Sequence, residues 1–278
     1  MAMIKVTDLQ YSMDENLYSN LVDFTDDTLH KWDLFLINDG IEGSGKTTLS
    51  EAEAYVINDR LRRKHKINTE LTLDNVLFTP QQIHDFIDNC PDYSQAIIDE
   101  AIIALFSGDG AKAIVKALVK KLVLIRKKKL SIILNIPWFY VLNMYLAVGR
   151  SKALIHVYTP DGRRRGWFEF YNYNQKHTMY FKNKKYFSYR GVKNDFRGTF
   201  PNTHGLFFDI KEYDRKKDDA IKSFDTEVQK KDKAKSMVAY FYHYRCYSCG
   251  APMKQKNIAE AYGCKQSNIS QMLKTDIN

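Results

Sequence analysis

The sequence contains few of the residues that mark disulfide-built, disordered or fibrous proteins. Four cysteines among 278 residues are too few for a disulfide framework, so a reducing compartment is expected. Only 13 glycines and 6 prolines occur, and we find no internal repeat and no low-complexity tract. Because 44% of the residues are hydrophobic, the chain has enough apolar surface to build an ordered core.

Long apolar runs are also scarce. The first residues lack the apolar stretch of a signal peptide. Residues 130–149 are uncharged and long enough to span a bilayer, but Pro137 divides them and Asn135 and Asn143 are polar. We therefore expect a buried strand followed by a helix, no membrane partner and a cytoplasmic protein.

Positive charge is in excess. Lys and Arg outnumber Asp and Glu by 42 to 33, which gives a formal net charge of +9. A surplus of this size favours a polyanionic partner. Nucleic acid is the first candidate.

Strand-like and helix-like segments alternate in the first half of the chain. Strands are expected at 32–39, 71–80, 95–101, 130–136 and 153–160, with helices at 47–64, 81–90, 111–126 and up to about 148. This order indicates an α/β fold with a mainly parallel sheet. We expect an N-terminal extension (1–30), a core (31–160), a basic, aromatic, β-rich extension with a charged connector (161–228) and a small helical module (229–278).

A glycine-rich loop joins the first strand of the core to its helix. The loop matches G-x-x-x-x-G-K-[ST], the pattern in which backbone N–H groups curl around a phosphate. Lys46 is expected to reach the β and γ phosphates of ATP, and Thr47 to ligate Mg²⁺. A glycine turn before a core helix is the alternative. The predicted nucleotide-binding residues are Gly40, Ile41, Glu42, Gly43, Ser44, Gly45, Lys46, Thr47 and Thr48.

Two acids, Asp99 and Glu100, end the apolar strand at 95–101. At this place Asp99 would hold Mg²⁺, and Glu100 would orient and polarise the water that attacks the γ-phosphate. A solvated acidic turn is the alternative.

Three further residues are candidates for a role at such a nucleotide site. Asn135 ends the next strand and would sense the γ-phosphate or cap the following turn. Arg126 and Arg150 each end a helix, so either one would reach a neighbouring subunit's nucleotide as an arginine finger or simply neutralise the carboxyl end of its helix.

The last forty or so residues have the pattern of a helix-turn-helix. One helical face carries Ile258, Ala259 and Tyr262, Gly263 supplies the turn, and Ile269 faces inward from a second helix. A packing-only helical hairpin is the alternative. The side chains left facing outward suit phosphates and base edges in a major groove, and they are Lys265, Gln266, Ser267, Asn268 and Gln271.

Two further groups of residues, outside these motifs, could bind a metal or a nucleic acid. Cys246 and Cys249 have zinc-ligand spacing, with His243 and Cys264 as completing ligands, although reduced structural thiols fit the pattern better.

The 161–228 extension combines basic side chains, which would bind a phosphate backbone, with aromatic rings that would stack on bases or pack in the core of a β-hairpin. These residues are Arg163, Arg164, Arg165, Trp167, Tyr171, Lys182, Lys184, Lys185, Tyr186 and Phe187.

Taken together, GIEGSGKT, IIDEA, LIRKKK and IILNIP resemble the additional-strand, catalytic-glutamate P-loop ATPases, in particular the FtsK/HerA-type motors and the zonular-occludens-toxin-like ATPases of viruses and plasmids. The resemblance covers about residues 31–160. It implies a RecA-like core, a homo-oligomeric ring and ATP hydrolysis coupled to DNA translocation, packaging or mobilisation. FtsK-like motors usually carry glutamine or threonine where this chain has Asn135.

Two rival functions share the same loop. GIEGSGKTT also looks like the phosphate loop of thymidylate kinases, but no arginine-rich lid is evident, and Asp59-Arg60 lies too close to the loop for the DR motif of those enzymes. The second rival is a DNA-binding regulator that uses ATP as a switch rather than as fuel.

Overall fold

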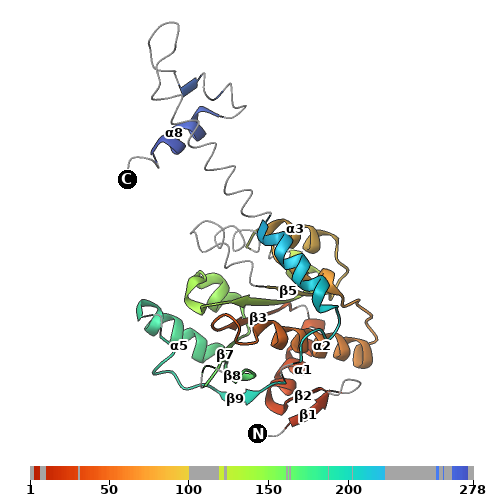
Figure 1. Cartoon of the computed structure of the whole chain (residues 1–278). Helices are drawn as coiled ribbons and strands as arrows, with labels where there is room; N and C mark the ends of the chain where they lie inside the picture. Colours follow the sequence, from red (N-terminus) through yellow and green to blue (C-terminus); the bar gives the residue numbers. More distant parts are fainter. Residues whose placement is uncertain are drawn as a thin grey trace, which may run out of the picture. The chain divides into compact units, whose positions relative to one another are not determined.

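The computed structural model describes residues 3–6, 11–30, 32–99, 119–121, 124–160, 162, 164–186, 188–201, 203–222, 255–256, 259 and 265–274. The chain divides into two compact units, Met1–Ala220 and Ile221–Asn278, and each is described by itself. The first unit holds the sheet and most of the helices (Figure 1).

A seven-stranded sheet forms the centre of the first unit, and its strand order is β4-β5-β6-β3-β7-β8-β9. Strands β4 to β7 pair in parallel, whereas β8 and β9 add in antiparallel fashion at one edge. The predicted α/β class with a mostly parallel sheet is confirmed. The bounds are β4 Val76–Leu77, β5 Gln95–Ile98, β6 Ser131–Ile136, β3 Leu34–Asp39, β7 Ala153–Tyr158, β8 Trp167–Tyr171 and β9 Phe196–Thr199.

The two central strands, β3 and β6, are buried along their whole length. Both of their faces are covered, which explains why they are apolar runs rather than alternating patterns. Strand β6 lies between β3 and β5. The strand that leads into the glycine loop and the strand that leads to Asp99 are therefore not neighbours.

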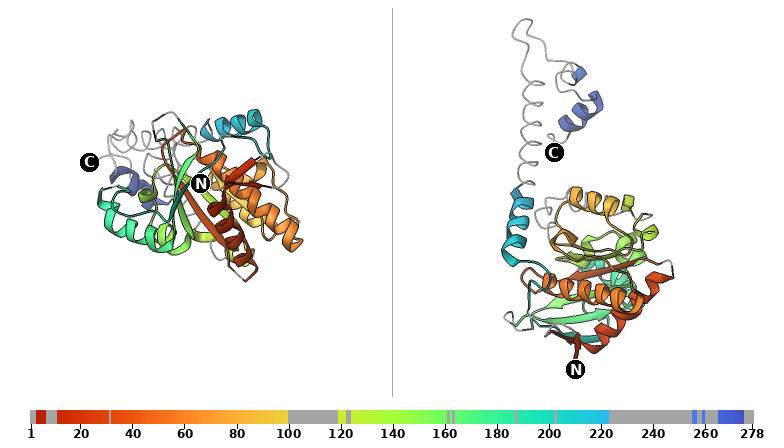
Figure 2. Two further views of the ribbon diagram at one scale, coloured as in Figure 1. Left: turned by 90° about the horizontal axis from the view of Figure 1, so that it is seen from below. Right: turned by 90° about the vertical axis from the view of Figure 1, so that its right-hand side faces the viewer.

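Helices cover both faces of this sheet. α1 (Glu15–Leu29) packs beside α2 (Lys46–His65) on one face, and α5 (Tyr173–Asn183) lies on the other (Figure 2). α3 (Pro80–Asn89) starts with a capping box in which Thr79 and Gln82 exchange hydrogen bonds. A hairpin of β1 (Met3–Val6) and β2 (Tyr11–Asp14) precedes α1.

The N-terminal extension and the part of the second extension up to Ala220 belong to the same compact unit as the expected core. Residues before 31 supply α1, whose Leu17 and Leu21 are fully buried. Residues after 160 supply β8 and β9 of the central sheet. Among the described residues, no helix combines the length and the apolar character needed to cross a bilayer.

Several predicted elements differ in the structure. The strand expected at 71–80 is reduced to β4 after a short 3-10 turn, because Thr72 and Asn75 cap that turn. The helix expected after Pro137 is a 3-10 turn (Phe139–Val141) followed by a π-helix (Tyr145–Arg150). Helix α5 was missed, although Asn172 and Gln175 form a capping box at its start. Of the helix predicted at 111–126, only 119–121 and 124–126 are described, and these are helical.

Candidate functional site

The glycine-rich loop lies where β3 ends and α2 begins. Gly40, Gly43 and Gly45 have φ angles of 141°, 71° and 103°, a region that favours glycine. A Cβ on Gly40 would overlap the carbonyl oxygen of Val157 on β7. The backbone can follow this path only with glycine at its first position, and the loop opens directly onto the N-terminus of α2.

Lys46 is the first residue of α2 and is buried, with only 3% of its surface exposed. Its Nζ donates hydrogen bonds to the carbonyl oxygens of Gly40 at 2.7 Å and Ile41 at 2.9 Å. The ammonium group therefore lies folded over the loop. Ser44 Oγ is buried and has no hydrogen-bond partner among the described residues. An unpartnered hydroxyl, a helix N-terminus and a lysine together fit an anionic group such as phosphate.

Asp99, immediately after β5, is fully buried and accepts hydrogen bonds from three separate elements. Thr47 Oγ1 lies 3.0 Å from Oδ2, Asn135 Nδ2 lies 2.9 Å from Oδ1, and the hydroxyl of Tyr213 donates to the same carboxylate. The predicted Thr47 and Asp99 pair is thus in contact. A hydroxyl beside a carboxylate fits Mg²⁺, which takes few protein oxygens and completes its shell with water and phosphate.

The described residues contain no cluster of three or more His, Cys, Asp or Glu side chains suited to a metal. Magnesium bound through a nucleotide does not need one. Glu100, the predicted water-activating residue, lies outside the described residues. Its role stays a prediction.

Asn135 belongs to a buried chain of hydrogen bonds that runs from the carboxylate of Asp99 into the core. Ser50 Oγ donates to Asn135 Oδ1 at 2.6 Å, and Asn38 Nδ2 donates to Ser50 Oγ at 2.9 Å and to Glu53 Oε2 at 2.7 Å. Burial raises the pKa of Glu53 to about 8, although the hydrogen bond from Asn38 opposes the shift. Asn135 thus positions Asp99, and the structure does not place it as the cap of a turn.

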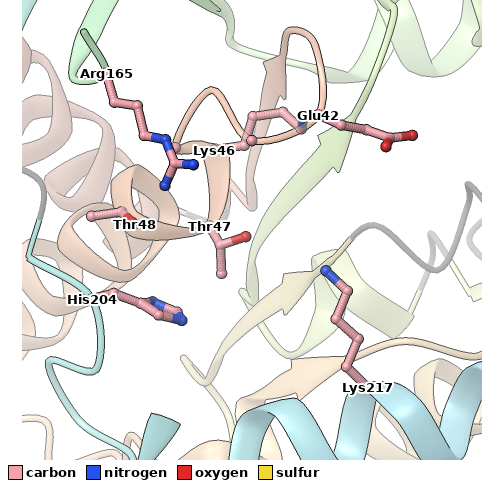
Figure 3. Close-up of a pocket in the computed structure, with 9 residues that line it drawn as sticks. Glu42, Lys46, Thr47, Thr48, Arg165, His204 and Lys217 are labelled. Carbon is pink, nitrogen blue, oxygen red and sulfur yellow. The ribbon is translucent and has the colours of Figure 1, made fainter. Parts of the chain in front are cut away.

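A cleft of about 450 Å³ opens in front of the loop (Figure 3). Three cationic side chains and a histidine face one acid, Glu42, in its lining, so the cleft is electropositive. This charge suits a polyphosphate. The lining consists of Glu42, Gly43, Gly45, Lys46, Thr47, Thr48, Arg165, His204 and Lys217.

His204 is held in this lining by a buried acid from α2. Glu51 is fully buried, pairs with His204 Nδ1, and accepts the backbone N–H groups of Gly205 at 2.8 Å and Leu206 at 2.9 Å. The hydrogen bond to Glu51 raises the pKa of His204. Because Nδ1 is engaged by Glu51, the Nε2 edge of the ring is the one left for the cleft.

A second acid and histidine pair lies behind the loop. Asp39, the last residue of β3, is fully buried. It contacts His156 Nδ1 at 2.9 Å, accepts the N–H of Phe139 at 3.0 Å and is hydrogen-bonded by Tyr189. Burial opposes a charged imidazole, but the carboxylate of Asp39 outweighs burial and raises the pKa of His156. This pair fixes the strand end from which the loop departs.

The two candidate arginine fingers lie away from the cleft of their own chain. Both precede a strand, so they sit at the amino ends of the parallel strands, whereas the loop lies at the carboxyl ends. Arg126 lies over the ring of Trp32, 5.7 Å from its centroid, and Arg150 forms an ion pair with Asp33. Their predicted action on a neighbouring subunit stays a prediction.

The basic and aromatic residues of the predicted extension separate in the structure. Arg165 lines the cleft near Gly43, and Tyr171 is buried beside Glu169. Tyr186 is 70% exposed, and Lys182 and Lys185 are exposed as well. Arg163 and Phe187 lie outside the described residues. Among these residues, the exposed ones that could still contact a nucleic acid are therefore those on and just after α5.

Only part of the predicted helix-turn-helix is described. α8 (Gln266–Lys274) matches the second predicted helix, with Ile269 fully buried. The predicted DNA-contacting residues Lys265, Gln266, Ser267 and Asn268 are exposed, and the side chain of Gln271 lies outside the described set. Outside it too are Gly263 and the candidate zinc ligands His243, Cys246, Cys249 and Cys264.

Sequence reasoning missed Tyr213, His204 and Lys217, which approach the loop from far along the chain. Their local sequence carries no motif, so only the fold reveals them. A comparison with protein-family models finds no match for this chain, and a comparison with curated proteins finds none either.

Proposed function

We propose that the first unit binds ATP and Mg²⁺ and hydrolyses ATP. Lys46 and the loop amides would bind the phosphates, and Thr47 and Asp99 would hold the metal, which neutralises charge on the β and γ phosphates when it is bound. Water attacks the γ-phosphorus, the bond to the bridging oxygen breaks, and ADP and phosphate leave. Glu100 is proposed to orient that water and to take up its proton.

One observation carries this proposal: the contact between Thr47, in the first turn of α2, and Asp99, immediately after β5, made across the intervening strand β6. A glycine turn that merely started a core helix would not need a buried carboxylate against its threonine. The strand order also supports the resemblance to additional-strand ATPases, because β6 separates the loop strand from the acidic strand.

We further propose that hydrolysis drives work on duplex DNA in a homo-oligomeric ring, as in a translocation, packaging or mobilisation motor. The support is the net charge of +9 and the exposed polar side chains of α8. The rivals are a nucleotide kinase and an ATP-switched DNA-binding regulator. Each rival predicts a different product or a different response to DNA.

The test begins with nucleotide binding and phosphate release, measured with and without duplex DNA. Lys46→Ala should lose binding, whereas Lys64→Ala, an exposed lysine on the same helix, should bind like the wild type. Asp99→Asn should lose Mg²⁺-dependent turnover, with Asp85→Asn, at an exposed acid on α3, as its control. Glu100→Gln should bind ATP without hydrolysing it.

The outcomes separate the candidates. DNA-stimulated release of inorganic phosphate supports the motor. Transfer of the γ-phosphate to a nucleoside monophosphate would assign the kinase instead. A change in affinity for one defined DNA sequence on ATP binding, without movement along nonspecific duplex, would assign the regulator.

A further inference from the structure

Residues 203–222 bring two further basic side chains, one histidine and one lysine, to the proposed phosphate cleft. His204 lies at the start of this segment, and Lys217 lies on a helix that spans 210–222. Figure 3 shows the ring of His204 and the ammonium of Lys217 directed toward the space in front of Thr47. Lys46 lies across that space, so the cleft has cations on two sides.

The helix at 210–222 is anchored so that Lys217 has a fixed position. Tyr213 and Lys217 are one helical turn apart and share a face. Tyr213 is buried, donates to Asp99 and stacks on Phe208 with ring centroids 5.3 Å apart. Lys216 Nζ donates to the carbonyl of Leu73 at 2.8 Å from the flank of the same helix.

The position of these two basic side chains bears on which phosphate of a bound nucleotide they would contact. The N–H groups of the loop would hold the inner phosphates, and Thr47 would help to hold a metal that neutralises charge on the outer ones. His204 and Lys217 face Thr47 rather than the crown of the loop. A cation in that position meets the outermost phosphate first, and that phosphate is absent from ADP.

We propose that His204 and Lys217 bind the terminal phosphate in cis, so that residues 203–222 distinguish a nucleoside triphosphate from a diphosphate. Tyr213 acts as a positioning residue, because it fixes both the helix that carries Lys217 and the carboxylate of Asp99. This inference rests on the proposed nucleotide site, and it assigns to the charged connector a part in ligand discrimination.

The test compares the affinities for ADP and for a nonhydrolysable ATP analogue, both with Mg²⁺, by titration calorimetry on the full chain. Lys217→Met keeps the aliphatic stem and removes the charge. It should weaken analogue binding about tenfold to hundredfold, the loss of one charge-assisted hydrogen bond, while ADP affinity stays within about twofold. Lys217→Arg keeps the charge and should retain discrimination. Lys211 is exposed on the same helix, so Lys211→Ala should leave discrimination unchanged.

His204→Asn provides the second variant. Asparagine can keep a contact with Glu51 but does not reach into the cleft, so analogue affinity should fall selectively there too. Thermal unfolding of each variant checks that the fold is retained. Selective loss in both variants, with discrimination retained in Lys217→Arg, supports the inference.

The two proposals fail in different ways. A wild-type chain that binds neither nucleotide would overturn both. A wild-type chain that binds both, combined with variants that lose ADP and analogue equally or lose neither, overturns terminal-phosphate recognition and leaves the nucleotide site intact.

Discussion

Replacing Glu53 by glutamine is expected to remove a pH dependence of folding stability. Glu53 lies on α2, fully buried, at the inner end of the hydrogen-bond chain that reaches Asp99. Burial raises its pKa from 4.5 to about 8. Glutamine has nearly the same shape and is never charged, so it retains the hydrogen bond from Asn38 without the ionisation.

The sign follows from proton binding in the two states. Between pH 4.5 and pH 8 the folded chain keeps a proton on Glu53, and the unfolded chain has lost it. Because the folded state binds more protons, the free energy of unfolding has its highest value below pH 4.5, as far as Glu53 is concerned, and falls as the pH rises. The slope is about 1.4 kcal/mol per pH unit, which accumulates to about 5 kcal/mol at pH 8.

The assay is urea unfolding of the wild type and Glu53→Gln at one-unit intervals from pH 5 to pH 9. The two free energies of unfolding should nearly coincide at pH 5 and diverge steadily in favour of the variant up to pH 8. Glu70→Gln, at an exposed acid just beyond α2, controls for the general loss of a negative charge. Parallel profiles for the wild type and Glu53→Gln would refute the idea that this carboxyl is protonated in the fold.

Three further outcomes are expected. Gly40→Ala should destabilise the fold by more than about 1 kcal/mol in chemical unfolding, because the new Cβ overlaps a β7 carbonyl oxygen at a positive φ; an unchanged midpoint would contradict the loop geometry. The Asp39 and His156 pair contributes stability that is present below pH 6.5 and lost as the pH rises through the raised pKa of His156; an NMR titration of Asp39→Asn should show that pKa lowered, and an unmoved pKa would exclude Asp39 as its cause. Tyr213→Phe removes a hydrogen bond to the buried carboxylate of Asp99 and should cost about 1.5–3 kcal/mol in thermal unfolding; wild-type stability would show that the hydroxyl contributes nothing.

The features that were predictable from the sequence are local ones. The apolar runs at 34–39, 131–136 and 153–158 predict buried parallel strands, because a strand that is covered on both faces has few polar residues. The glycine loop is recognisable because glycine positions, lysine and threonine all lie within one short segment. Asp99 is recognisable because it ends an apolar run. In each case the signal and the structure that it predicts share the same few residues.

The features that were missed depend on contacts between distant segments. The helix at 210–222 has the composition of an exposed connector, and most of its side chains are indeed exposed. An exposed helix is expected from so charged a stretch, but Tyr213 and Ala220 are its two buried residues, too few to show from the sequence that it packs against the core. The hydrogen bond from Tyr213 to Asp99 spans 114 residues, and nothing local encodes it.

The inner side of α2 bears on how this helix can move. Apolar helix faces slide over a sheet because dispersion contacts are exchanged one for another with little change in energy. Ser50, Glu51 and Glu53 instead tie α2 to the strands and to residues 204–206 through directional bonds, which weaken steeply when their angles change. A displacement that starts at the glycine-rich loop must therefore break several of these hydrogen bonds before α2 can shift against the sheet.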